Sequence, residues 1–296
     1  MIDELKKYGD LEEHASTKLL NTYKIGGSTR YLIEPNSIQD LVSILKILKE
    51  NNIKWFILGN GSNIILNSRE YDGAFIKLNK LNGLEVNGNN IYAEAGVMVP
   101  NLVKVATDNS LMGLEFAAGI PGTVGGSVYG NAGAYNSCIM DYVQSVTVID
   151  DDLNIKVIEH EDINYSYRMT DFKNNKKQII VAVKFTLTEG EKERSMALIN
   201  DRRKRRLESQ PLEYPSAGSV FRNPEGDFAG RLVEICDLKG YKIGGAEVSE
   251  KHANFIVNAG NATSEDVYNL IHYVHDTVKE KTHVDLLCEQ EFIDWE

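Results

Sequence analysis

The chain has 296 residues and a mass of 33.1 kDa; 42% of its residues are hydrophobic and 25% are charged. A chain of this length and apolar content can bury substantial cores, so the composition excludes a disordered, collagen-like or low-complexity protein and favours about two domains. Its 32 basic and 43 acidic residues give a formal net charge of −11, which argues against a general binder of nucleic acid or anionic membranes.

Three isolated cysteines and a charged N-terminus are the features that indicate where in the cell the protein is expected. Cys138, Cys236 and Cys288 form no CxxC pair, so we predict neither a disulfide scaffold nor a zinc site. The N-terminal segment MIDELKKYGDLEEH lacks the apolar core of a signal peptide, and no window approaches the ~18 apolar residues of a membrane span. We therefore expect a soluble cytoplasmic protein that does not insert into a membrane.

The first eighty residues have an alternating α/β pattern. A helical period covers residues 37–51 behind Ser37, a suitable N-cap, and a strand is predicted at 54–58. The loop GNGSN and the β-like runs IIL and GAFIKL come next. Two β-rich runs between 84 and 95 flank Asn87-Gly88, which predicts a hairpin.

The middle of the chain contains its most unusual segment. A predicted helix at 100–110 opens with Pro100 and leads into residues 113–135, GLEFAAGIPGTVGGSVYGNAGAY, which hold seven glycines. Three β-like runs follow, at 143–150, 155–159 and 178–187.

A long charged helix at 191–207 is typical of a connector, and the turn-rich QPLEYPSAGS after it marks a domain boundary. The remaining pattern predicts helices at 227–237 and 264–281, the second behind Thr263, and strands at 254–258 and 284–293. We predict a domain boundary at the turn-rich segment, followed by a compact C-terminal α/β region of about ninety residues.

Both glycine-rich loops suit a phosphate-bearing ligand. Glycine allows positive φ and lets backbone N–H groups approach a phosphate closely. The loop GNGSN, residues 59–63, could equally be a tight structural turn, but a second such loop at 113–135 favours a dinucleotide. The sequence contains neither GxxxxGK[ST] nor a GxGxxG fingerprint, so neither a P-loop nor a Rossmann site is predicted.

Seven motifs together resemble one enzyme family. They are NTYKIGGSTRYLIEP, LGNGSN, GLEFAAGIPGTVGGSVYGNAGAY, YSYRMTDF, PLEYPSAGSVFRNP, KIGGAEVSEKHANFIVN and LLCEQEFI. They occur in the order seen in the UDP-N-acetylenolpyruvoylglucosamine reductase family, from about residue 15 to the end. The resemblance implies an α+β protein with the two-subdomain FAD-binding fold of the vanillyl-alcohol oxidase type and a C-terminal α/β cap that binds substrate. The two FAD-binding subdomains would be residues 1–80 and 81–205, and the substrate-binding domain would be residues 206–296.

The resemblance also implies which residues hold FAD. Gly59, Asn60, Gly61, Ser62 and Asn63 would wrap the pyrophosphate. The residues expected to approach the flavin and its ribityl chain are Ile120, Pro121, Gly122, Thr123, Gly125, Gly126, Ser127 and Asn131. Some members of the broader fold link the flavin covalently through a His beside the first loop. This loop ends in Asn63, so we predict non-covalent FAD.

The family's reaction implies two demands on the protein. NADPH reduces FAD, and a UDP-sugar then receives hydride on the methylene carbon of its enolpyruvyl ether, so negative charge develops on the adjacent carbon and its carboxylate. That charge needs a nearby cation and a proton. Arg168, in YSYRMTDF, matches the family arginine at the carboxylate, and Ser219, in PSAGSVF, matches the proton donor. Without the resemblance, Arg168 would be read as a surface side chain and Ser219 as a turn serine.

Glu289 matches a strand glutamate that faces the substrate carboxylate. The family usually shows an order such as EVR where this chain has Glu289-Gln290-Glu291, so Glu291 competes for the role. Strand alternation places both glutamates on the same face and leaves the choice open.

Arg206 and Asn223 match family positions near the diphosphate and the enolpyruvyl end of the substrate. The other charges of the run 202–206 fit a solvated helix face better than a nucleic-acid site. The short segment between Arg168 and Ser219 resembles the family's second type, which lacks a tyrosine-bearing loop over the substrate.

His272 and His275, three residues apart, have no acidic partner at matching spacing, so we predict no metal site, and His252 has no assigned role. We infer no protein partner. Two other functions stay open on the residues alone. One is an oxidase or dehydrogenase of a small alcohol or lactate on the same fold, and the other is a non-catalytic nucleotide-binding protein.

Overall fold

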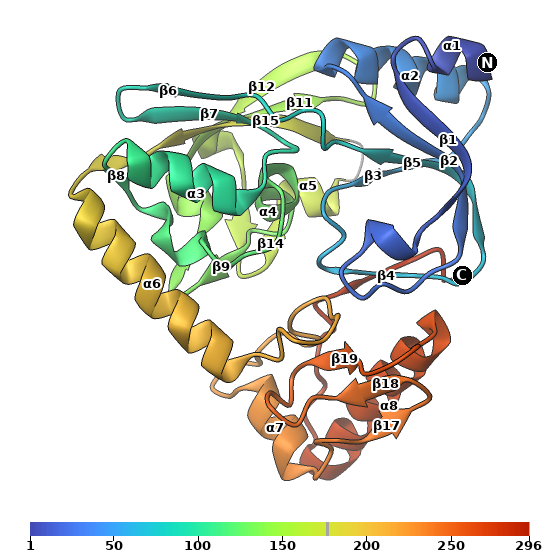
Figure 1. The fold of residues 1–296 in the computed structure, drawn as a ribbon, viewed down its shortest axis with the longest axis vertical. Helices are drawn as coiled ribbons and strands as arrows, with labels where there is room; N and C mark the ends of the chain where they lie inside the picture. Colours follow the sequence, from blue (N-terminus) through green and yellow to red (C-terminus); the bar gives the residue numbers. More distant parts are fainter. Residues whose placement is uncertain (176–177, 296) are drawn as a thin grey trace. The chain divides into compact units, whose positions relative to one another are not determined.

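The computed structural model describes residues 1–175 and 178–295, which group into two compact units. The first unit comprises residues 1–13, 31–60 and 73–204, and the second comprises 14–30, 61–72 and 205–296. The chain passes between the units within β1 (Gly9–Ser16), β2 (Ser28–Pro35), β5 (Glu70–Lys77) and α6 (Lys192–Ser209), and again after Asn60. Figure 1 labels these four elements. The predicted three-part division stays a prediction.

The predicted α/β opening is confirmed. Helix α2 (Ile38–Glu50) begins behind Ser37, whose hydroxyl accepts a hydrogen bond of 3.1 Å from the Asp40 backbone N–H. Strand β3 (Trp55–Leu58) pairs in parallel with β5, in a sheet of order β1-β2-β5-β3. The helix α1 (Ile2–Leu5) precedes them.

A five-stranded antiparallel sheet of order β12-β11-β15-β7-β6 forms the rest of the first unit's framework. Its strands are β6 (Leu84–Asn87), β7 (Asn90–Glu94), β11 (Val143–Ile149), β12 (Ile155–Glu159) and β15 (Ile179–Thr186). The predicted hairpin is confirmed, with Gly88 at φ +56° between β6 and β7. Glycine at that position avoids the strain that a Cβ would bring.

The glycine-rich segment is not the continuous loop that its composition suggests. Helix α3 (Val99–Asp108) precedes a 3₁₀ turn, η2 (Leu114–Ala117), and a short helix, α4 (Val124–Tyr129). A Cβ at Gly125 would lie 2.8 Å from the Ala95 Cβ, so glycine allows α4 to pack closely behind the end of β7.

Short elements complete the two units. They are η1 (Lys18–Leu20), β4 (Ile64–Leu66), β8 (Leu111–Met112), β9 (Gly133–Ala134), β10 (Ser137–Cys138), η3 (Ile139–Tyr142), η4 (His160–Asp162), β13 (Tyr165–Ser166), β14 (Met169–Thr170), α5 (Asp171–Asn174) and β16 (Thr188–Glu189).

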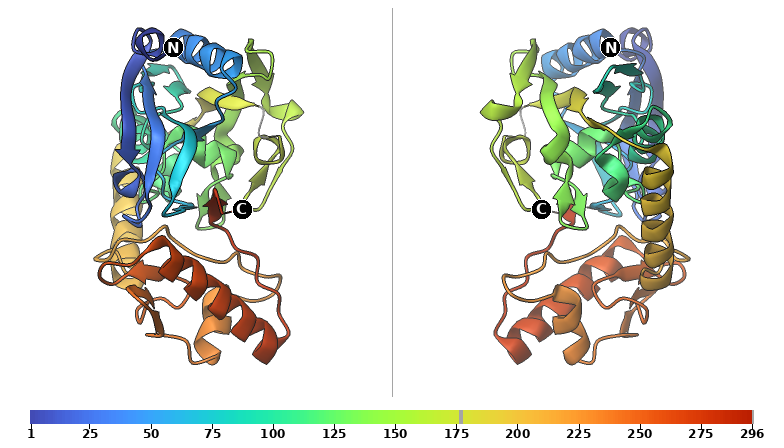
Figure 2. Two further views of the ribbon diagram at one scale, coloured as in Figure 1. Left: turned by 90° about the vertical axis from the view of Figure 1, so that its right-hand side faces the viewer. Right: turned by 90° about the vertical axis from the view of Figure 1, so that its left-hand side faces the viewer.

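The C-terminal part of the second unit is a small α/β layer pair. Helix α8 (Ser264–Thr282) packs along an antiparallel sheet of β17 (Lys242–Ile243), β18 (Ala246–Val248) and β19 (Ile256–Asn258), as Figure 2 shows. Helix α7 (Ala229–Ile235) contacts α8. The predicted start of α8 is confirmed by a reciprocal capping box between Thr263 and Asp266.

One strand prediction was wrong, and two strands were missed. The last strand was expected over residues 284–293, but only β20 (Glu291–Ile293) forms, in parallel with β4. The segment before it pairs instead through an isolated bridge between Phe221 and Cys288, so it changes partner at Gln290. Strands β1 and β2 were not predicted. In β1 most residues are exposed and charged, so no alternation can be recognised, whereas β2 alternates between buried and partly or fully exposed positions.

Candidate functional site

The first unit brings the start of GNGSN against the glycine-rich segment. Gly59 follows β3, and a Cβ there would lie 2.7 Å from the Thr123 hydroxyl oxygen. Asn60 donates a side-chain hydrogen bond of 2.6 Å to the carbonyl of Pro121. Residues 120–123, with Ile120 half-buried and Gly122 and Thr123 buried, therefore lie beside the first loop, as a shared ligand would require.

Helix α4 offers an accessible backbone and an unsatisfied hydroxyl. The Thr123 hydroxyl accepts from the backbone N–H of Gly126 at 3.3 Å. A Cβ at Gly126 would meet only that same hydroxyl, at 3.4 Å, and Gly126 is exposed. Ser127 is 3% exposed, and its Oγ has no hydrogen-bond partner among the described residues. A buried polar atom without a partner is costly, so this position fits a bound group that supplies one.

Arg168 lies at the tip of a short hairpin that contacts the glycine-rich segment. It occupies the loop between β13 and β14 at φ +59°, and its guanidinium donates a hydrogen bond of 2.9 Å to the carbonyl of Gly133. The side chain of Asn131 donates to the carbonyl of Ser166 at 2.8 Å and accepts from the Met140 N–H at 3.4 Å. Asn131 is 3% exposed, so its side chain ties the hairpin to the glycine-rich segment.

The rest of the first loop belongs to the second unit. Gly61 has φ +63°, and a Cβ there would lie 2.1 Å from the carbonyl oxygen of Leu20, so only glycine fits. Ser62 is half-buried. Asn63 donates from Nδ2 to the carbonyl of Glu289 at 3.1 Å, and its own carbonyl accepts from the Glu291 N–H at 3.0 Å. The loop end is thereby joined to the C-terminal segment.

Ser219 and Glu289 lie on neighbouring segments of the second unit. The Glu289 N–H donates to the carbonyl of Val220 at 2.7 Å, and Ser219 forms an isolated bridge with Phe255. Ser219 is partly exposed, and its hydroxyl makes no hydrogen bond within residues 1–175 and 178–295. Glu289 and Glu291 are both partly exposed, so burial does not distinguish them.

Two buried amides beside Ser219 were not selected from the sequence. Asn254 accepts from the Phe221 N–H at 2.9 Å and donates to the Phe221 carbonyl at 2.8 Å, in the manner of a paired strand. Gln290 is 3% exposed and contacts the Ser219 turn from the other side. For Asn254 the available signal was an amide between the apolar residues Ala253 and Phe255, whereas Gln290 stands between two glutamates and gave no such signal.

The basic residues 202–206 differ in how far their side chains are exposed. Arg206 is half-buried near the end of α6, whereas Arg203 and Lys204 are exposed. Arg202 holds its guanidinium 5.0 Å from the ring centre of Tyr135, in the first unit. Asn223, in the second unit, accepts a hydrogen bond of 3.1 Å from the Ala229 N–H at the start of α7, which leaves its Nδ2 for other partners.

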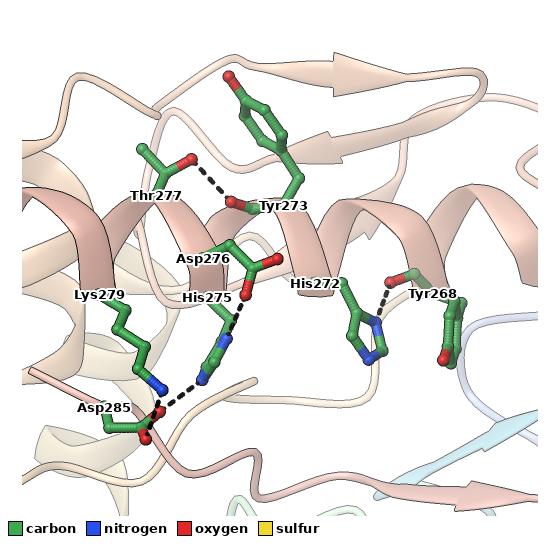
Figure 3. Close-up of polar contacts among 8 residues, drawn as sticks. All are labelled: Tyr268, His272, Tyr273, His275, Asp276, Thr277, Lys279 and Asp285. Atoms are coloured by element: carbon green, nitrogen blue, oxygen red, sulfur yellow. Dashed lines mark hydrogen bonds and ion pairs between the residues drawn. The ribbon is translucent and has the colours of Figure 1, made fainter.

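The histidines of α8 are engaged by other side chains and backbone (Figure 3). His272 donates from Nδ1 to the Tyr268 carbonyl at 2.8 Å, because a carbonyl can only accept. His275 lies between two carboxylates, those of Asp276 and Asp285, each 2.8 Å from a ring nitrogen. Over the described part of the chain, no group of three or more His, Cys, Asp or Glu side chains could hold a metal ion.

His252 is the histidine that contacts the buried amide Asn254. Burial lowers the pKa of His252, and its Nδ1 accepts a hydrogen bond of 3.2 Å from the Asn254 N–H. A proton on Nδ1 would break that bond, so the neutral ring supports Asn254.

Comparison with known proteins assigns families to both parts of the chain. Residues 29–157 match the family model described as FAD binding domain. Residues 210–293 match the model of the UDP-N-acetylenolpyruvoylglucosamine reductase C-terminal domain. A protein from Clostridium beijerinckii named UDP-N-acetylenolpyruvoylglucosamine reductase is 46% identical over 267 residues, which cover 90% of this chain and 88% of that protein.

Solved structures agree with the expected fold class. The crystal structure of UDP-N-acetylenolpyruvylglucosamine reductase from Thermus caldophilus matches with a TM-score of 0.83 at 30% identity, covering 96% of this chain and 99% of that one. Phl p 4.0202, a glucose dehydrogenase, matches 64% of this chain and 44% of its own with a TM-score of 0.50 at 16% identity, a likeness of fold alone. The expected two-part FAD fold with an added C-terminal domain is confirmed. No helix in the described residues is both long and apolar enough to cross a membrane.

Proposed function

Because the chain belongs to the UDP-N-acetylenolpyruvoylglucosamine reductase family, we propose that it reduces the enolpyruvyl ether of its UDP-sugar to the lactyl ether of UDP-N-acetylmuramate. The observation that carries this proposal is identity of 46% across nine-tenths of the chain, FAD-binding and C-terminal regions included. The enzyme is an FAD-dependent oxidoreductase of peptidoglycan precursor synthesis. Bound FAD supplies hydride transfer, from NADPH to the methylene carbon of the substrate.

The residues of the first loop and of α4 fit FAD. At Gly59 and Gly61 a Cβ would clash with neighbouring atoms, so these positions require glycine. Without side chains there, the loop backbone can turn tightly and present its N–H groups to a pyrophosphate. The unpartnered Ser127 Oγ and the exposed backbone at Gly126 offer a hydroxyl and an open approach to the flavin side. These contacts support the assignment of the cofactor-binding residues.

Arg168 is proposed to bind the substrate carboxylate. Hydride addition to the methylene carbon leaves negative charge on the adjacent carbon, and conjugation spreads it onto the carboxylate. A guanidinium stays charged at all physiological pH values and can bind both carboxylate oxygens. The hairpin tip and the bond to the Gly133 carbonyl hold this side chain in one orientation before substrate arrives.

Ser219 is proposed to donate the proton that completes the reduction. Its partly exposed hydroxyl has no competing hydrogen bond among the described residues. Hydride on one carbon and a proton on the other together saturate the double bond, and Ser219 is left as an alkoxide that must regain a proton from solvent. Glu289 is proposed to lie near the substrate carboxylate, on the segment paired with Val220.

Arg206 and Asn223 are proposed to bind the UDP-sugar. The half-buried Arg206 suits the diphosphate, since a partly desolvated guanidinium binds phosphate more strongly than an exposed one. Asn223 retains its Nδ2 donor for the substrate's oxygen atoms. A cytoplasmic location is part of the proposal, because Cys138, Cys236 and Cys288 are free thiols.

An anaerobic two-step titration of the purified protein tests this function against its rivals. NADPH should bleach the flavin absorbance, and the enolpyruvyl UDP-sugar should restore it without oxygen, with UDP-N-acetylmuramate as the product. An alcohol or lactate oxidase of the same fold would be bleached by its alcohol and would recover only with oxygen or another acceptor. A non-catalytic nucleotide-binding protein would fail at the first step.

A further inference from the structure

Gln290 is a buried polar side chain in the C-terminal segment, between two partly exposed glutamates. Its side chain is only 3% exposed. Burial of an amide costs free energy unless its donors and acceptor are paired. The contacts of Gln290 therefore show which neighbours it serves.

The Gln290 amide nitrogen faces three consecutive backbone carbonyls of the turn that carries Ser219. Nε2 lies 3.1 Å from the carbonyl oxygen of Ala217, 3.3 Å from that of Gly218 and 3.4 Å from that of Ser219. The amide has two N–H donors for three acceptors, so the carbonyls of Ala217 and Gly218, at the shorter distances, accept its main hydrogen bonds. One side chain thus spans the whole turn up to the proposed proton donor.

The other end of the amide is anchored by Tyr23. The Tyr23 hydroxyl donates to Gln290 Oε1 at 3.1 Å, and Tyr23 is fully buried. Burial raises the pKa of Tyr23, so the phenol remains a donor at physiological pH. Backbone carbonyls accept and never donate, so the NH2 group of the amide must face the turn and its oxygen must face Tyr23.

The turn needs such support because its backbone is unusual. Gly218 has φ +75°, and a Cβ built there would meet no atom within 4 Å, so side-chain packing does not confine the turn at this point. The Ser219 Oγ is bonded directly to Cβ, so a shift of the turn backbone moves the hydroxyl with it. Proton transfer is sensitive to displacements of about 1 Å.

We propose that Gln290 is a positioning residue, which holds the Ala217–Ser219 turn through its amide so that the Ser219 hydroxyl is aimed at the carbon to be protonated. The inference rests on the proposed function. Gln290 does not touch the reacting atoms, and Tyr23 acts on the turn only through it.

The test compares the two half-reactions in Gln290→Leu, which is similar in size but leaves the turn carbonyls and the Tyr23 hydroxyl without their partner. Flavin reduction by NADPH should change less than about 3-fold, because it needs no proton from Ser219. Flavin reoxidation by the enolpyruvyl UDP-sugar should slow about 10- to 100-fold at saturating substrate. The solvent deuterium isotope effect on reoxidation should increase, since a misaligned proton transfer becomes rate-limiting.

Two further variants separate positioning from general stability. Phe292→Leu alters packing three residues beyond Glu289 and should lower Tm without changing the ratio of the half-reaction rates. Tyr23→Phe removes only the anchoring hydroxyl and should slow reoxidation in the same direction by a smaller factor. Amide hydrogen exchange over residues 216–222 of the substrate-free enzyme should be faster in Gln290→Leu than in Phe292→Leu.

The outcomes distinguish this inference from the proposed function. Failure of the wild-type flavin to be reoxidised by the enolpyruvyl sugar would overturn the function itself. With an active wild type, equal slowing of both half-reactions in Gln290→Leu, or an unchanged isotope effect and unchanged exchange, would overturn the positioning role alone.

Discussion

The side-chain amide of Asn131 donates a 2.8 Å hydrogen bond to the carbonyl of Ser166, two residues before Arg168. Sequence resemblance places Asn131 beside the flavin. In the structure its Nδ2 and Oδ1 bind backbone atoms of Ser166 and Met140, and its own N–H donates to the carbonyl of Val128. The side chain therefore supports the hairpin that presents Arg168.

Replacement of Asn131 by Ala should disturb substrate reduction more than FAD binding. A loosened hairpin would misplace the Arg168 guanidinium, so we expect reoxidation by substrate to slow roughly 10-fold, with little change in NADPH oxidation. Stopped-flow absorbance measures both steps, and Asn82→Ala, at an exposed position of the same unit, is the control. Loss of FAD with both rates intact in the remaining holoenzyme would instead favour the flavin contact that the sequence predicts.

Arg206 and Arg203 should differ although both belong to the basic run of α6. Arg206 is half-buried and Arg203 is exposed, so only the first is expected to contact the substrate's diphosphate. A charged hydrogen bond is worth ~1.5–3 kcal/mol, so Arg206→Ala should raise the substrate KM roughly ten-fold to a hundred-fold. Arg203→Ala should leave it within about 2-fold. Small and equal effects would count against the assignment.

FAD should be released by acid. Asn63 occupies the end of the first loop, and its amide is not a nucleophile and is already bonded to the Glu289 carbonyl. Trichloroacetic acid precipitation of the yellow protein should leave the chromophore in the supernatant. Flavin that stays in the washed pellet would show a covalent link and refute the prediction.

Stability should fall in mild acid because of His252. Burial lowers the pKa of His252 below its unfolded value of about 6.5, so the unfolded chain binds more protons as the pH falls. This contribution is complete above about pH 6.5 and is lost as the pH falls toward the folded pKa. The Tm of the wild type should therefore decline between pH 7.5 and 5.5, and His252→Gln should flatten the decline.

The matched control for that experiment is His283→Asn, at the exposed left-handed C-cap of α8, where Asn is tolerated. It should keep the wild-type pH slope. Identical slopes in the wild type and in His252→Gln would show that another group causes the decline.

The sequence predicted most helices and strands, because helix caps, turns and hydrophobic periodicity depend on residues close together in the chain. Ser37 and Thr263 cap the helices expected of them, and the turn at Gly88 forms the expected hairpin. The C-terminal strand was misjudged because its residues exchange one partner for another at Gln290, a tertiary effect that alternation cannot show. The same holds for the site. Motif resemblance pointed to Ser219, but the buried amide that spans its turn is found only where segments 71 to 73 residues apart in the chain meet.

The half-reactions of Ser219→Ala test the central claim most directly. NADPH should bleach the flavin of this variant at nearly the wild-type rate, because that step takes no proton from Ser219. Reoxidation by the enolpyruvyl UDP-sugar should slow by about 10²- to 10⁴-fold, the usual contribution of a general acid, and Ser219→Cys should recover part of it. Normal reoxidation of Ser219→Ala by the substrate, or equal loss in the NADPH step, would contradict the account.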